Sequence, residues 1–116
     1  MSPRSLGELA KMRCQACRPD SPAVPAGEYA ELLAKLDGWA INTVDGVVQL
    51  TKIYTRDDFA GALDLANRIG AVAEAEDHHP RLVVEWGSLA VSWWTHTIAG
   101  LHMNDFILAA RCEELA

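Results

Sequence analysis

The chain has 116 residues, of which half are apolar, and a formal net charge of -6 at pH 7. This length suits one domain with one core, and no apolar run approaches the roughly 20 residues of a membrane-spanning helix. The first residues also lack the apolar segment of a secretory signal, so we expect a cytoplasmic protein without a membrane segment. The ten basic residues are dispersed, which argues against direct nucleic-acid binding.

Residues 1–25 are predicted to form a flexible N-terminal arm, because prolines at positions 19, 22 and 25 interrupt regular structure. Cys14 and Cys17 in this arm have the spacing of half a zinc knuckle or of a redox dithiol. A structural zinc site takes four ligands, and Cys112 alone cannot supply a second pair. Reduced thiols in a cytoplasmic arm are therefore the simpler interpretation, and residues 26–116 are expected to form a single domain.

The pattern then alternates between helices and pairs of strands. Helical spacing of apolar residues predicts a helix over residues 26–36, followed by strands over 39–44 and 47–54 joined by the favoured turn Asp45-Gly46. A capping pattern at Thr55 and Asp58 begins a long helix that runs to about Ala75. Strands over 82–86 and 89–96 and a last helix over 103–115 complete the order. This order predicts an α+β fold, a four-stranded, mostly antiparallel sheet with three helices packed on one face.

The register of the second hairpin follows from its predicted loop, Gly87-Ser88. This loop sets Trp86 opposite Leu89 and brings His79 opposite His96, so that two imidazoles meet at the open end of the hairpin. Side chains alternate along each strand, so this pairing places Trp86 and Trp93 on the same face of the hairpin. We expect that face to lie in the core. The other face mixes Trp94 with small and apolar residues, which is typical of an oligomer contact. We therefore expect a homodimer or homotetramer.

Three of the four histidines lie in one frame, which runs Glu74, His78, His79, Pro80, Trp86, His96 and Asp105. Imidazole is well suited to proton transfer near neutral pH, so this concentration of histidines indicates acid–base chemistry. Three imidazoles and a carboxylate can also hold zinc or iron. Because adjacent His78 and His79 diverge on any regular element, we expect a site without a metal.

These residues resemble the signature of the pterin-4a-carbinolamine dehydratases. That signature is a charged residue, three positions, His, His or Asn, a small residue or Pro, five or six positions, an aromatic, nine positions, His or Trp, and a later Asp. Every element is met here. The stretches Gly38-Trp39 and Gly100-Leu101 are also similar to the bacterial branch, and the resemblance covers about residues 28–115. It implies the family's α+β fold and its assembly as dimers or tetramers.

The resemblance implies that the substrate is 4a-hydroxytetrahydropterin, the product of pterin-dependent aromatic amino-acid hydroxylases. Dehydration would give quinonoid dihydropterin and water and would recycle the hydroxylase cofactor, so a hydroxylase is the implied functional partner. Neither a metal nor an organic cofactor is required. In the implied catalytic set, His78 and His96 look like the general acid and base, and His79 looks like the residue that holds the pterin.

Further residues would complete the binding site. Glu74, one helical turn before His78, would hydrogen-bond an imidazole and set its tautomer. The pocket would also be lined by Asp77, Trp94, Thr95 and Thr97. Asp105 is expected to be structural, as the third residue of the last helix, where it can close a capping box. His102 is expected to be a weak helix cap outside the site.

A role without catalysis is the alternative that the resemblance leaves open. Some proteins of this fold act as binding or assembly factors, in transcription-factor dimerisation or in RuBisCO assembly. Such a role would use the helix face and the oligomer surface and would not need the histidines. Because all three histidines are retained, the sequence favours the enzyme.

Overall fold

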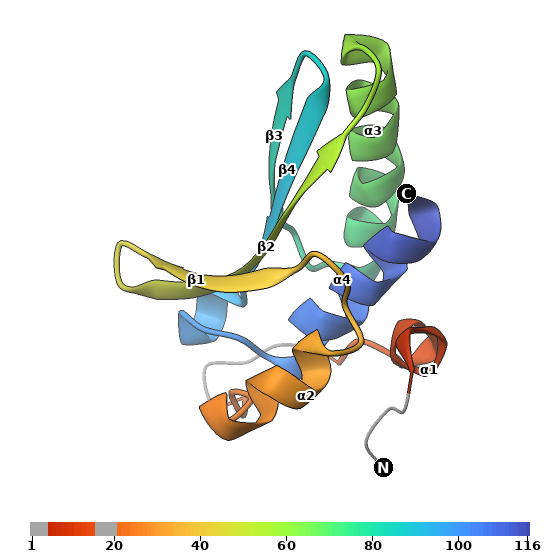
Figure 1. Ribbon diagram of the computed structural model, residues 1–116. Coiled ribbons are helices and arrows are strands. Elements are labelled where there is room, and N and C mark those ends of the chain that lie inside the picture. Colours follow the sequence, from red (N-terminus) through yellow and green to blue (C-terminus); the bar gives the residue numbers. More distant parts are fainter. Residues whose placement is uncertain (1–4, 16–20) are drawn as a thin grey trace.

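The computed structural model describes residues 5–15 and 21–116 (Figure 1). Its elements are α1 (Leu6–Lys11), η1 (Ala26–Glu28), α2 (Tyr29–Leu33), β1 (Ala40–Val44), β2 (Val47–Thr55), α3 (Phe59–Glu76), β3 (Arg81–Glu85), β4 (Ser88–Trp93), η2 (His96–Ile98) and α4 (Met103–Leu115). The strands form one sheet in the order β1-β2-β4-β3, and every pair is antiparallel. The predicted α+β class is confirmed. No described helix is long and apolar enough to cross a membrane.

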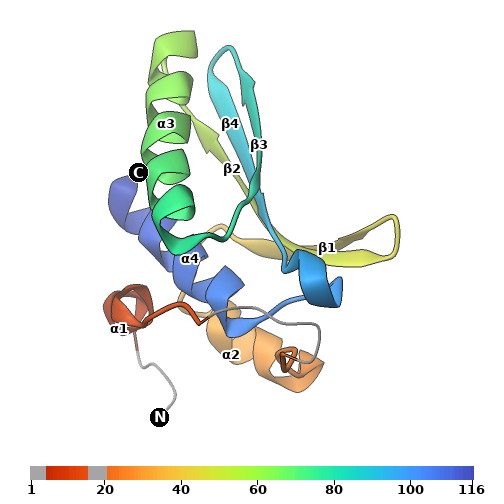
Figure 2. The same ribbon diagram turned by 180° about the vertical axis from the view of Figure 1, so that it is seen from behind.

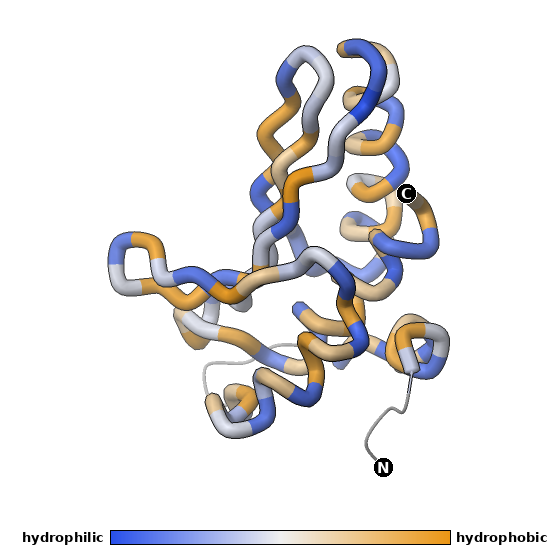
Figure 3. The backbone as a smooth tube through the Cα atoms, viewed as in Figure 1, coloured by the Kyte–Doolittle hydropathy of each residue, from blue (hydrophilic) through white to orange (hydrophobic). Residues whose placement is uncertain are grey.

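The helices α3 and α4 lie against one face of the twisted sheet (Figures 1 and 2). On α3 the residues facing the sheet alternate with polar residues toward solvent, as the bands of colour in Figure 3 show. By contrast, α4 is the central helix, because all residues from Asn104 to Ala110 are buried. The sheet and α3 cover it on one side, and α1 covers it on another. The first turn of α4 therefore lies inside the protein.

The first hairpin forms as predicted. Val44 pairs with Val47, and the loop between them is Asp45-Gly46. Both loop residues have positive φ, 50° for Asp45 and 79° for Gly46, which is the requirement of a type I′ turn. Aspartate and glycine are among the residues that accept this conformation most readily, so the local sequence sets the register of β1 and β2.

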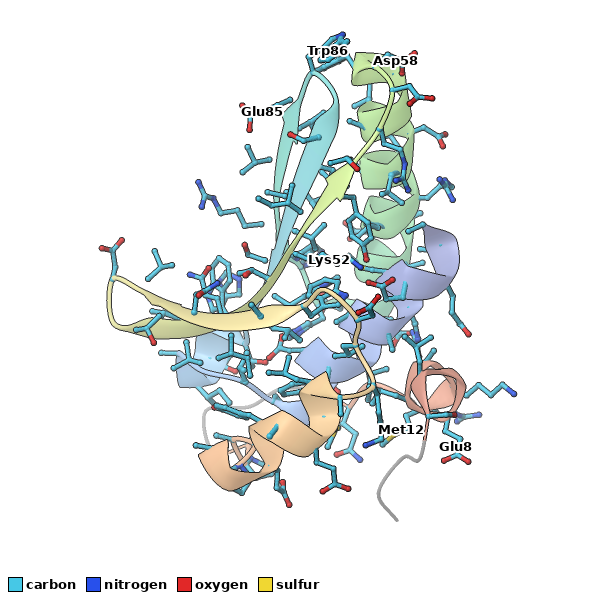
Figure 4. The ribbon with its side chains drawn as sticks, viewed as in Figure 1. Glu8, Met12, Lys52, Asp58, Glu85 and Trp86 are labelled. Atoms are coloured by element: carbon cyan, nitrogen blue, oxygen red, sulfur yellow. The ribbon has the colours of Figure 1, made fainter. Side chains whose placement is uncertain are left out.

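The second hairpin turns one residue earlier than predicted. Its loop is Trp86-Gly87, with Gly87 at φ 78° in the second position, and Glu85 pairs with Ser88. The register shifts by two residues, so each strand side chain stays on the face that was predicted for it. Trp93 therefore still lies in the core at 1% exposure. Trp86 instead lies at the exposed tip of the hairpin, where it is 75% exposed (Figure 4). The prediction that Trp86 is a core residue is wrong.

The predicted strand pairing of His79 with His96 is also absent. Pro80 cannot donate a ladder hydrogen bond, and β3 begins only after it, at Arg81. At the other end β4 stops at Trp93, and the chain then forms the short helix η2. A bridge between Thr95 and Gly100 closes this loop. The two histidines therefore flank the sheet and do not extend it.

The arm is more regular than its prolines suggested. Residues 6–11 form α1, which Ser5 caps by accepting a hydrogen bond from the Glu8 backbone N–H at 3.2 Å. Leu9 and Ala10 are buried against α4. The expectation of an irregular arm is corrected for this stretch, because the prolines on which it rested, at positions 19, 22 and 25, all come after α1. The Cys14–Cys17 spacing stays a prediction, because Cys17 lies outside the described residues.

Candidate active site

A buried carboxylate organises the site. Asp105, in the first turn of α4, has 0% exposure and contacts donors from three segments of the chain. Its Oδ1 lies 2.6 Å from His78 Nε2. Its Oδ2 accepts from the Thr95 hydroxyl at 2.8 Å and from the His102 backbone N–H at 2.9 Å. Asp105 therefore ties the end of α3, the end of β4 and the start of α4 to one point.

His78 reaches Asp105 because α3 ends in a left-handed residue. Asp77 caps the helix with φ 50° and ψ 42°, and the His78 backbone N–H donates to the carbonyl of Ala73 at 3.1 Å. This ending turns the chain sharply, so that the His78 imidazole is buried and lies parallel to the Trp93 indole, at 5.9 Å between ring centroids and 8° between planes. The ring is thus held on its face and at one nitrogen.

The bond to Asp105 also sets the tautomer of His78. A carboxylate can only accept, so Nε2 carries the proton and donates it to Asp105. In the neutral ring Nδ1 then keeps a lone pair. We expected Glu74 to orient an imidazole, and for His78 that part is played by Asp105. Glu74 instead lies 3.4 Å from His79 Nε2, in an exposed pair.

His102 caps α4 in the way expected for this position. Its Nδ1 accepts from the Asn104 backbone N–H at 3.0 Å, and Asp105 returns the bond to the His102 backbone, which completes a capping box. The predicted capping role of Asp105 is confirmed, but the same carboxylate also holds His78. Burial lowers the pKa of the His102 imidazole, against the opposing effect of the Asp105 charge. His102 therefore favours the neutral form that accepts the capping bond.

His96 lies on the other side of the site, at the start of η2. Its ring stacks on Trp94, with 4.7 Å between centroids and 28° between planes, while the side chain stays exposed. Thr95 beside it is buried, and its backbone N–H donates to Gly100 at 2.8 Å. The fixed backbone of Thr95 and the Trp94 ring together restrict where His96 can lie.

The three histidines of the frame border one pocket of about 570 Å³. It is lined by Cys14, Gln15, Glu76, Asp77, His78, His79, Thr95, His96, Thr97 and Asn104. The pocket thus brings together most of the predicted binding residues, whereas Glu74 and Trp94 do not line it and instead contact His79 and His96. Sequence reasoning missed Cys14, Gln15, Glu76 and Asn104 as lining residues. Among residues 5–15 and 21–116, no cluster of His, Cys, Asp or Glu side chains is arranged to hold a metal ion.

The fold and the site define a small α+β protein with a histidine-lined pocket over a buried His–Asp pair. The chain belongs to the pterin 4 alpha carbinolamine dehydratase family, whose model matches residues 22–115.

Its relatives in sequence and structure agree with this assignment. A protein of Gloeobacter violaceus named "putative pterin-4-alpha-carbinolamine dehydratase 1" is 49% identical over 108 residues, which are 93% of each chain. A protein of Chlorobium luteolum with the same name but no number is 46% identical over 95% of this chain and 96% of its own. The crystal structure of a "transcriptional coactivator/pterin dehydratase" from Brucella melitensis has a TM-score of 0.73 and 28% identity, and the match covers 82% of this chain and 99% of that one.

Proposed function

We propose that this protein dehydrates 4a-hydroxytetrahydropterin to quinonoid dihydropterin and water. The observation that carries the proposal is the pocket shared by His78, His79 and His96, in which Asp105 fixes the ring of His78. Its volume of about 570 Å³ is within the range of small-molecule sites. The family that the chain belongs to supports the same substrate.

The reaction needs one proton donor and one proton acceptor. The bond between C4a and the hydroxyl oxygen breaks as that oxygen receives a proton and leaves as water. N5 loses its proton, and its electron pair forms the new double bond to C4a. His78 suits the base, because its Nε2–H is engaged by Asp105 and Nδ1 keeps the lone pair. The carboxylate would then balance the charge of the protonated ring.

His96 suits the acid. Its ring is exposed at the pocket and can take up a proton from solvent between turnovers, while Trp94 restricts its orientation. His79, which pairs with Glu74 at the rim, would hold the pterin. Each positioned acid or base typically contributes about 10² to 10⁴ in rate. Two such groups supply the chemistry without a metal or an organic cofactor.

The source of the substrate would be a pterin-dependent aromatic amino-acid hydroxylase in the same cytoplasm. That class of enzyme releases the 4a-hydroxy compound, and the dehydratase would return the pterin toward its reduced form. The reaction proposed here would therefore follow hydroxylation and precede reduction.

The open face of the sheet suits assembly into a homodimer or homotetramer. Val83, Ala90 and Ile53 lie in one row across β3, β4 and β2, and Ile53 is 67% exposed. No described helix covers this part of the sheet (Figures 1 and 2). Light scattering should give a multiple of the chain mass for the parent and a smaller mass for Ile53→Asp. A monomeric parent would contradict the proposal.

Formation of quinonoid dihydropterin from freshly generated carbinolamine tests the function. The parent should exceed the uncatalysed rate, and His78→Gln and His96→Ala should each lower kcat by about 10² or more. His78→Gln is the sharper variant, because its amide still offers a donor to Asp105 while it removes the base. A parent rate equal to the background would overturn the proposal.

A second candidate is a binding role, for which the Brucella melitensis protein is named a coactivator. The observation in its favour is the exposed Trp86 at the hairpin tip, beside the start of α3, where Phe59 is 46% exposed (Figure 4). Exposed aromatic side chains of this kind often mark protein contacts. Trp86→Ser should abolish such a contact and leave turnover unchanged, and a loss of turnover would speak against a separate binding surface.

A further inference from the structure

One side of the pocket is built by the N-terminal segment. Cys14 and Gln15 follow α1 and line the pocket, and we call these two residues the N-terminal wall. This wall lies before residue 22, where the match to the family begins. The pocket of this protein therefore has a side that the family-matched part of the chain does not supply.

A buried amide on α4 holds the wall at Gln15. The Gln15 backbone N–H donates to Asn104 Oδ1 at 2.9 Å, and Asn104 Nδ2 donates to the Gln15 carbonyl at 2.6 Å. Asn104 is 1% exposed, so both bonds are shielded from water at one end. This two-point contact fixes the position and the direction of the Gln15 backbone.

A second α4 side chain holds the residues that lead into the wall. Arg111 donates from Nε to the Ala10 carbonyl at 3.0 Å and from Nη2 to the Met12 carbonyl at 2.7 Å. It also contacts Glu76, a pocket residue, at 2.8 Å. Arg111 lies about two helical turns after Asn104, on the same face of α4. Leu9 is fully buried in the core, so the segment is anchored both before the wall and at Gln15.

Gln15 is exposed and lines the pocket, and the part of it that Asn104 holds is the backbone. Its side chain is a carboxamide, which has a donor and an acceptor in one plane. The pyrimidine edge of a pterin carries a carbonyl oxygen, a ring N–H and an amino group, which are one acceptor followed by two donors. A carboxamide can pair with the carbonyl oxygen and the ring N–H of such an edge through two bonds. Under the proposed function the histidines would act away from this edge, at C4a and N5.

We infer that Gln15 binds the pyrimidine edge of the pterin substrate and that Asn104 is the positioning residue that holds Gln15 there. The inference rests on the proposed function for the identity of the substrate. Because Gln15 contacts the part of the ring that does not react, it contributes equally to binding of substrate and transition state. Its loss therefore raises KM and leaves kcat unchanged.

The test compares the full-length parent with Gln15→Ala, and with Arg13→Ala as the matched control. Arg13 is exposed two positions before Gln15, outside the N-terminal wall, and does not line this pocket. Gln15→Ala should raise KM about three- to tenfold at constant kcat, as expected for one or two neutral hydrogen bonds, and Arg13→Ala should match the parent. An unchanged KM for Gln15→Ala would overturn the inference while leaving the enzyme in place.

A double-mutant cycle tests the role of Asn104. If Asn104 acts through Gln15, the double variant Asn104→Ala/Gln15→Ala should have no higher KM than the worse single variant. Multiplicative effects on KM would show that Asn104 acts independently and would remove it from the proposal. Unfolding in urea identifies any part of the Asn104 effect that comes from lost stability, since Asn104 is buried.

Binding of 7,8-dihydrobiopterin, measured by fluorescence titration, separates the two proposals. It has the same pyrimidine edge but cannot undergo the dehydration. If the parent shows no turnover, the proposed function fails. A dissociation constant three- to tenfold weaker in Gln15→Ala would then still support the inference. If the parent does not bind this pterin, or if Gln15→Ala binds it equally well, the inference fails.

Discussion

Replacing Asp105 with asparagine should separate folding from catalysis. The amide offers one acceptor and one donor in place of two acceptors. The His102 backbone N–H and the Thr95 hydroxyl both lie at Oδ2, so the amide oxygen should remain there. The NH₂ group then takes the place of Oδ1 and donates to His78 Nε2. The ring proton of His78 must move to Nδ1, which removes the lone pair that we assign to the base.

The two effects differ in size. For stability, the capping box keeps its acceptor, and one charge-assisted hydrogen bond becomes a neutral bond of about half the strength. The free energy of unfolding should therefore fall by about 1–2 kcal/mol. For catalysis, the base is present in the wrong tautomer, and kcat should fall about 10²- to 10⁴-fold. KM should change little, because the walls of the pocket are retained.

Single-turnover formation of quinonoid dihydropterin gives the rate, urea unfolding gives the stability, and ¹⁵N shifts of the His78 ring report its tautomer. Asp58→Asn is the matched control, because Asp58 caps α3 by accepting from the Gly61 N–H at 2.7 Å and does not line the pocket. Asparagine caps helices about as well as aspartate, so this variant should lose at most about 1 kcal/mol of stability and keep the rate of the parent. If Asp105→Asn turns over like the parent although the ring proton has moved to Nδ1, the tautomer reasoning is refuted.

Three further predictions concern stability and reactivity. Because burial lowers the pKa of His102, the unfolded chain takes up a proton before the folded protein does, so stability should decline as pH falls below about 6.5. Urea unfolding should show a weaker decline in His102→Ser, which keeps a capping oxygen. Glu113 Oε1 accepts from the Trp39 indole at 2.7 Å and contacts Lys52, so Glu113→Ala should cost about 2–4 kcal/mol in urea unfolding. Burial raises the pKa of the Cys112 thiol to about 12, so mass spectrometry should find it unalkylated by iodoacetamide at pH 8 until the protein unfolds.

Each of these has a result that would contradict it. Equal pH slopes for the parent and His102→Ser would show that another group controls the decline. Glu114→Ala is the control for Glu113→Ala, because Glu114 is the exposed neighbour and should change stability by less than about 0.5 kcal/mol. Similar losses of stability for the two variants would contradict the role of the contacts that Glu113 makes with Trp39 and Lys52. Alkylation of Cys112 at the same rate in folded and denatured protein would contradict its burial.

The sheet could be predicted because its turns are local. Asp45 and Gly46 both accept positive φ, so the first register follows from two adjacent residues. The second hairpin was placed wrongly because Gly87 can serve in either loop position, and the sequence does not distinguish the two. The faces of the strands were still predicted correctly, since the shift of two residues keeps the alternation.

The pairing within the site could not be predicted from local patterns. Glu74 is the carboxylate that helical spacing brings close to His78, but the left-handed Asp77 ends the helix and turns His78 away from it. Asp105 lies 27 residues from His78 in sequence, and only the packing of α4 against the end of α3 brings them together. The helix α1 was missed for a similar reason, since six residues form a stable helix only when another element covers them.

The anchoring of the N-terminal wall to α4 also bears on how the protein is made. The ribosome synthesises α4 after every other described element, so the segment that emerges early must wait for its partners, Asn104 and Arg111, to appear. Until then the nascent chain contains the β-strands and the histidines, but its pocket lacks the side that the N-terminal wall supplies. Joining two segments so far apart in the sequence delays the mature pocket until α4 has been made, and it makes closure of the pocket depend on long-range contacts.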